Sequence, residues 1–130
     1  VLDRATGELL AADPYVEVNW ATHVDLKTGR PVEALGAAYR GKGIYIRPGP
    51  LGGHNWQAMS FSPKTGLVYI PAQDNGRYFE QPAGPVTFTP NQYNLGLGSI
   101  GRNVDRYDIP YKGRLLAWDP VARKPRWTPC

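Results

Sequence analysis

The chain has 130 residues, 42% of them hydrophobic, which suits one ordinary domain with a modest core. Its formal charge of +4 comes from scattered Lys and Arg with acids between them, so it predicts a solvated basic surface and excludes a nucleic-acid-binding stripe. The single cysteine, Cys130, excludes an internal disulfide, a paired-cysteine metal site and a haem c attachment motif within these residues, and no apolar run is long enough to predict a transmembrane helix.

The residue types favour strands and turns. Thirteen prolines and fifteen glycines interrupt the chain too often for long helices, whereas an aromatic content of 12% suits half-buried pleated strands. The composition therefore predicts an all-β, turn-rich chain.

Three segments repeat one turn pattern, at residues 3–7, 25–29 and 62–66. Each places Asp or Ser ahead of a Thr-Gly pair, where the short side chain can bond the turn backbone and Gly supplies a positive φ. We expect a tight β-turn at each. The first turn lies so near Val1 that almost none of its first strand precedes it, so residues 1–12 are expected to be the end of a hairpin that begins upstream.

Two hairpins are predicted after the first two turns, and the third turn lies within the first of these hairpins. Residues 67–72 form a continuous apolar, β-branched run, typical of a strand buried on both faces, and residues 56–61 complete the hairpin with it. The second hairpin runs from residues 114–118 to residues 124–127, where Pro125 indicates an edge strand.

Between the hairpins, residues 73–113 are rich in Gly, Pro, Asn and Tyr and carry no sustained period. This stretch is predicted to be a long loop, which in a compact domain is functional or packed against another element.

Two hairpins make four antiparallel strands, the unit of a β-propeller, in which each blade buries its faces against its neighbours. The predicted fold class is therefore all-β, with about one four-stranded antiparallel blade of a propeller plus part of the preceding blade. We expect residues 1–12 to end one blade, residues 13–51 to connect the blades, and residues 52–130 to form the next blade, with residues 73–113 as its long insertion.

Several motifs together resemble one enzyme family. The sequence is similar to the pyrroloquinoline-quinone (PQQ)-dependent alcohol dehydrogenases, the family of methanol and ethanol dehydrogenases, over most of residues 1–72 and again over residues 113–127. The resemblance is carried by residues 1–7, by Val-Asn-Trp-Ala at residues 18–21, and above all by Gly-Gly-His-Asn-Trp at residues 52–56 and the run at residues 59–72. It implies an eight-bladed propeller of which this chain is a fragment.

The family's tryptophan-docking repeat has an Ala followed at fixed spacing by Asp, Gly and Trp. Ala117, Asp119 and Trp127 fit this spacing, but Arg123 stands where the family has glycine. An earlier copy at residues 1–11 is also imperfect.

The resemblance maps one cofactor-binding residue onto this chain, Asn55 of the Gly-Gly-x-Asn-Trp motif. In the family its amide hydrogen-bonds the edge of the PQQ, which lies on the propeller axis beside Ca²⁺ or a similar cation. The competing interpretation is a turn asparagine that bonds its own backbone. His54 is expected to be a surface residue or a hydrogen-bonded one, outside the site. No catalytic residue and no metal ligand is predicted in this chain, because the family's catalytic aspartate and cation ligands belong to other blades.

The tryptophans are predicted to pack and not to bind substrate. Trp56, Trp118 and Trp127 are expected between blades, because aromatic side chains dominate buried contacts.

The resemblance implies that the parent protein oxidises a primary alcohol to an aldehyde by hydride transfer to bound PQQ, with the cation polarising the quinone carbonyl. It further implies a periplasmic location, a cytochrome or quinone as electron acceptor, and a haem c domain in some members. This chain would form a wall of the cofactor funnel and be inactive alone. Two alternatives stay open: a non-catalytic propeller scaffold for protein interactions, and a carbohydrate-binding β domain.

Overall fold

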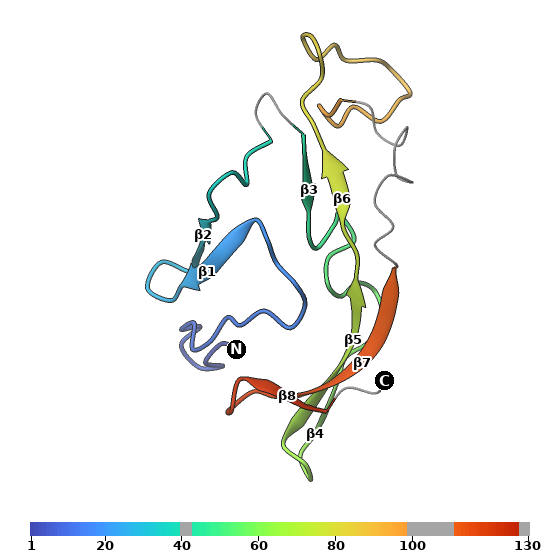
Figure 1. Cartoon of the computed structure of the whole chain (residues 1–130). Coiled ribbons are helices and arrows are strands. Elements are labelled where there is room, and N and C mark those ends of the chain that lie inside the picture. The colour runs from blue at the N-terminus through green and yellow to red at the C-terminus, as the bar shows by residue number, and fades with distance from the viewer. Residues whose placement is uncertain (40–42, 99–110, 128–130) are drawn as a thin grey trace.

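The computed structural model describes residues 1–39, 43–98 and 111–127, shown in Figure 1; Cys130 lies outside these ranges. Within them the chain forms antiparallel strands, turns and irregular segments, without a helix. No helix in the described part is therefore long and apolar enough to span a membrane. The all-β prediction is confirmed.

The main sheet has four antiparallel strands in chain order. They are β4 (Ser60–Ser62), β5 (Leu67–Asp74), β7 (Lys112–Asp119) and β8 (Lys124–Trp127). Figure 1 shows β5 and β7 side by side as a long curved pair. This is the predicted four-stranded blade, and Pro125 lies on an edge strand as expected, because β8 is the last strand of the sheet.

Two smaller sheets complete the described strands. β1 (Ala21–Asp25) and β2 (Arg30–Glu33) form a hairpin around a predicted turn, and β3 (Ile44–Ile46) pairs with β6 (Arg77–Phe79). The prediction of a loop without strands over residues 73–113 is wrong at β6 and at the ends of β5 and β7. A three-residue strand is too short to show a period, and its partner lies far back in the chain.

The first strand of the main sheet is shorter than predicted. A strand was expected over residues 56–61, but β4 covers only Ser60–Ser62. Beyond β4, other groups bond the same edge of β5: the Gly53 carbonyl accepts from the Gln73 N–H at 2.9 Å, and His54 Nδ1 lies 3.1 Å from the Pro71 oxygen. The edge of β5 is thus occupied by a loop where a longer β4 would have paired.

The hydrophobic core lies on one face of the main sheet. Ile70, Ala72 and Leu116 are buried there, with Leu116 only 2% exposed. Tyr15 and Val16, from the segment before β1, pack against this cluster. The opposite face of β5, with half-buried Tyr69 and Pro71, is less enclosed than the predicted strand buried on both faces. Val68 and Trp118 extend the packed face.

The three predicted turns share one geometry. In each, the glycine has φ between 68° and 77° and its N–H donates to the backbone oxygen of the residue four positions earlier. The carboxylates of Asp3 and Asp25 accept further backbone N–H groups at 2.8 to 2.9 Å, which holds their pKa values below the usual range. The turn predictions are confirmed, at Asp3–Gly7, Asp25–Gly29 and Ser62–Gly66.

A fourth turn of this kind joins β7 to β8 without a glycine. The Arg123 N–H donates to the Asp119 oxygen at 2.8 Å, and Arg123 has φ +58°, in the left-handed region that favours glycine. Its guanidinium makes two hydrogen bonds to the Asp13 carboxylate, at 2.8 and 2.6 Å. The arginine that breaks the docking repeat thus adopts the backbone of the missing glycine and adds an ion pair to the preceding segment.

Candidate functional site

Asn55 ends a glycine-rich loop that covers one edge of β5. Its side chain is exposed, and its Nδ2 donates to the Leu51 carbonyl at 3.0 Å. The structure thus contains the local turn bond of the competing interpretation. This bond uses one of the two amide hydrogens, and no other hydrogen bond is formed by the Asn55 amide within the described ranges. The amide therefore still offers one donor and one acceptor outward.

The neighbours of Asn55 differ in their surroundings. The Trp56 side chain is 85% exposed, so its packing between blades stays a prediction. His54 is turned back to the sheet, where its Nδ1 lies 3.1 Å from the Pro71 oxygen. The exposed amide is consequently flanked by an exposed aromatic ring on one side and a hydrogen-bonded imidazole on the other.

The other two tryptophans contact the main sheet. Trp118 packs against the core cluster, and the Trp127 ring lies 6.1 Å from the ring of Tyr69. Trp118 thus packs within this chain, whereas Trp127 is 46% exposed, and the packing of both rings between blades stays a prediction.

Two side chains that the sequence analysis did not single out hold the loop of Asn55. Asn75 accepts from the Gly49 N–H at 2.8 Å and donates to the Gly52 oxygen at 2.7 Å. Gln73 Nε2 donates to the oxygens of Leu51 and Gly52, at 3.1 and 3.2 Å. Both residues are buried, Asn75 being 9% and Gln73 8% exposed. The available signal was their spacing of two, which places two amides on one face of a strand end.

The glycines of this loop are required by close contacts. A Cβ at Gly53 would lie 2.4 Å from Val16 Cγ2, and one at Gly49 would lie 2.7 Å from Asn75 Oδ1. Gly52 has φ +72°, and its N–H closes a turn to the Gly49 oxygen at 2.9 Å. The loop thus follows a path that only glycine permits at these positions.

The residues around Asn55 fit a planar quinone with polar edges. An exposed amide with one free donor and one free acceptor can bond a carbonyl or carboxylate edge, and an exposed indole adds a flat apolar surface. Within the described ranges, no three His, Cys, Asp or Glu side chains gather as metal ligands.

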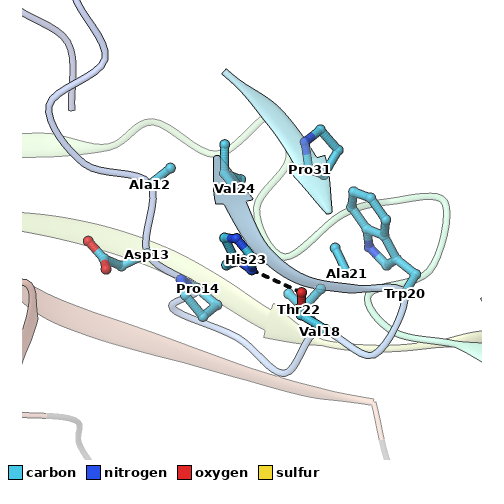
Figure 2. A pocket seen from close by; sticks show the side chains of 10 residues that line it. All are labelled: Ala12, Asp13, Pro14, Val18, Trp20, Ala21, Thr22, His23, Val24 and Pro31. Carbon is cyan, nitrogen blue, oxygen red and sulfur yellow. Dashed lines mark hydrogen bonds between the residues drawn. The ribbon is translucent and has the colours of Figure 1, made fainter. Parts of the chain in front are cut away.

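A separate cavity of about 250 Å³ lies between the segment before β1 and the β1–β2 hairpin. Figure 2 shows it lined mainly by apolar side chains, with His23 bonded to the Thr22 hydroxyl at 3.0 Å. Asp13, at its rim, is paired with Arg123, and hydrogen bonding from that guanidinium is the main cause that holds the pKa of the Asp13 carboxyl low. This cavity therefore presents its carboxylate already engaged in an ion pair. It does not include Asn55.

One ion pair and one hydrogen bond fasten the segment before β1 to the main sheet and its β7–β8 turn. Arg114 pairs with Asp74 on the neighbouring strand and also donates to the Tyr15 oxygen at 3.2 Å. Together with the Asp13–Arg123 pair, this contact keeps Tyr15 and Val16 against the core, and Val16 in turn sets the space for Gly53.

Comparison with known proteins gives one consistent group. No family model matches the chain. The chain is 46% identical to the quinohemoprotein alcohol dehydrogenase ADH IIB of Pseudomonas putida over 131 residues, which cover 98% of this chain and 18% of that protein. It is 38% identical to the quinoprotein ethanol dehydrogenase of Pseudomonas aeruginosa, over 98% of this chain and 21% of that protein.

Solved structures agree with the sequence matches. The chain superposes on the quinohemoprotein alcohol dehydrogenase ADHIIG of Pseudomonas putida with a TM-score of 0.83 at 37% identity, covering 98% of this chain and 20% of that one. The enzyme of Comamonas testosteroni gives 0.80 at 38% identity, again with 98% of this chain and 20% of that one. The four-stranded antiparallel sheet is thus a blade-like segment of the propeller that these proteins share, as predicted.

Proposed function

Since the chain belongs to the quinoprotein alcohol dehydrogenases, we propose that it forms part of a PQQ-dependent enzyme that oxidises a primary alcohol to an aldehyde. It spans only 18% of the length of its relative ADH IIB, so the activity is proposed for the whole protein. The observation that carries the proposal is the Gly-Gly-His-Asn-Trp loop, which leaves the Asn55 amide exposed with a free donor and acceptor.

In this proposal the segment forms a wall of the cofactor funnel. Asn55 bonds the polar edge of the quinone, and the glycines beside it let the backbone approach closely. When bound, the quinone would accept one hydride, and with it two electrons, from the alcohol carbon, while a base takes the hydroxyl proton and Ca²⁺ or a similar cation acts as Lewis acid. The base and the cation ligands would come from residues outside this chain.

The proposal also covers the cellular location of the whole protein and its electron acceptor. The enzyme works in the periplasm and passes electrons to a cytochrome or quinone, and the whole protein carries a haem, as the name quinohemoprotein says of its relatives ADH IIB and the Comamonas testosteroni enzyme.

A segment exchange tests this function. The chain replaces the matched stretch of Pseudomonas putida ADH IIB, which has nearly the same length. We expect the chimera to oxidise primary alcohols with an artificial dye as acceptor, and only when PQQ is present. The chain alone serves as the negative control and is expected to show no turnover.

Asn55→Ala in the chimera tests the site. Loss of one well-placed hydrogen bond should weaken PQQ binding to the apoprotein by about tenfold. Asn94→Ala is the matched control, because among the described residues the Asn94 amide bonds only Thr89 and Gln92 of its own exposed loop. Equal PQQ affinity in the Asn55 variant and the chimera would refute the cofactor role, and a folded chimera that binds no PQQ would favour the scaffold alternative.

A further inference from the structure

We infer that Gln73 is a positioning residue for Asn55, and that it sets the direction of the Asn55 amide through a carbonyl that both side chains share. This inference rests on the proposed function of Asn55 as a ligand of the quinone. It assigns part of the cofactor affinity to a buried residue that lies on β5, beneath the loop, and does not face the cofactor.

The shared atom is the Leu51 carbonyl oxygen. Gln73 Nε2 donates to it at 3.1 Å and Asn55 Nδ2 donates to it at 3.0 Å. A carbonyl oxygen has two lone pairs, and both are used here. Asn55 is exposed and its amide has no other hydrogen bond in the described ranges. The position of the Leu51 oxygen therefore determines the orientation of the Asn55 amide.

Gln73 is itself held rigidly. Its backbone N–H donates to the Gly53 oxygen at 2.9 Å, its Oε1 accepts from the Tyr111 hydroxyl, and only 8% of the residue is exposed. It lies on β5, which is paired along its length with β7. A side chain on a rigid strand can therefore fix a loop residue to within the tolerance that ligand binding needs.

The gain in affinity comes from preorganisation. An exposed amide on a glycine-rich loop would sample several orientations. Binding the quinone would then be weakened by the conformational entropy that the amide loses. With the Leu51 oxygen held by Gln73, the free donor and acceptor of Asn55 already point in one direction before the quinone arrives.

The role of Gln73 can be separated from folding because its removal orphans no buried carbonyl. In Gln73→Met, the Leu51 oxygen keeps its bond from Asn55 and the Gly52 oxygen keeps its bond from Asn75. The Tyr111 side chain is exposed, since the residue is 61% exposed, so its hydroxyl can turn to water. Met fills about the same volume as Gln, and we expect the variant to fold.

A double-mutant cycle in the chimera tests the inference, with PQQ affinity of the apoprotein as the readout. Gln73→Met should weaken PQQ binding by about 3- to 10-fold. Asn55→Ala combined with Gln73→Met should bind PQQ no more weakly than Asn55→Ala alone, because Gln73 acts through Asn55. Asn94→Ala is the control: the Asn94 amide bonds Thr89 and Gln92 in a separate exposed loop, so its removal should change the affinity less than about twofold.

The cycle separates the two possible failures. Additive losses, or an unchanged affinity in Gln73→Met while Asn55→Ala binds weakly, would overturn the positioning role and leave the proposed function intact. An unchanged affinity in Asn55→Ala would overturn the proposed function, and the positioning role with it.

Gln73→Glu provides a second readout if Gln73→Met fails to fold. The Glu side chain has the same shape, but its carboxylate cannot donate to the Leu51 oxygen, whereas the protonated carboxyl can. Its PQQ affinity relative to the unsubstituted chimera should rise as the pH falls from about 7 to about 5, since burial raises the pKa of a carboxyl. A flat ratio across that range would count against the shared hydrogen bond.

Discussion

The loop of residues 49–55 and the turn of residues 119–123 are held in place by opposite means. The loop is held from outside, by buried Gln73 and Asn75 more than twenty positions along the chain. The turn is held mainly by its own first residue, Asp119, whose carboxylate accepts the N–H groups of Val121 and Ala122 at 3.0 and 2.8 Å. Neutral amides fix the candidate site, while a charged side chain fixes the surface turn.

Asn75→Leu should give the largest loss of stability. The substitution leaves the buried Gly49 N–H without its acceptor and removes the donor to the Gly52 oxygen. An orphaned buried N–H costs roughly 1–3 kcal/mol, so the free energy of unfolding should fall by about that amount. Urea unfolding of the full chain, followed by tryptophan fluorescence, measures it.

Asn94→Leu is the matched control for Asn75→Leu. Within the described ranges its amide makes three hydrogen bonds to backbone groups, against two for Asn75, but the groups around Asn94 are exposed and water can replace the lost partners. We expect a smaller loss of free energy of unfolding than for Asn75→Leu. An equal loss would contradict the distinction between buried hydrogen bonds to distant residues and exposed hydrogen bonds to neighbouring ones.

Arg123 should show a smaller effect that separates backbone strain from the ion pair. Arg123→Ala loses the bonds to Asp13 and keeps a side chain at φ +58°, whereas Arg123→Gly loses the same bonds and relieves the strain. We expect Arg123→Gly to be more stable than Arg123→Ala by about 1 kcal/mol. Urea unfolding of both variants measures the difference, and equal stability would show that the left-handed conformation costs nothing here.

This contrast also explains what could be predicted from the sequence. The turns at Asp3–Gly7, Asp25–Gly29 and Ser62–Gly66 were predicted because each is determined by adjacent residues. The main sheet was predicted because its two central strands, β5 and β7, are eight residues long and carry apolar runs.

What could not be predicted depends on contacts between distant residues. β6 is three residues long and is defined by its pairing with β3. The shortened β4 follows from a loop that occupies the edge of β5. Asn55 was singled out by its motif, and its cofactor role stays a prediction. The contacts of Gln73 and Asn75 depend on which loop folds over them, and no local pattern encodes that.

The smallest predicted effect is a pH dependence confined to the turn. Hydrogen bonding from the Ala122 N–H is the main cause that holds the pKa of Asp119 below its usual range, with the Val121 N–H and nearby Arg126 and Lys124 adding to it. A carboxyl whose pKa is lowered by folding stabilises the fold above the ordinary carboxyl pKa of about 3.9, and this contribution is lost as the pH falls through the folded value.

Asp119→Asn keeps an acceptor for the same two N–H groups but has no charge to lose. The Tm difference between the unsubstituted chain and this variant should therefore be constant above about pH 5 and shrink below about pH 4. Thermal unfolding followed by circular dichroism across this range measures it, and the other acidic residues cancel in the comparison. For Gln73→Met the Tm difference from the unsubstituted chain should not shrink at low pH, because a neutral amide does not titrate. A constant Tm difference for Asp119→Asn down to about pH 3 would mean that the turn, like the loop, is held by hydrogen bonds without help from charge.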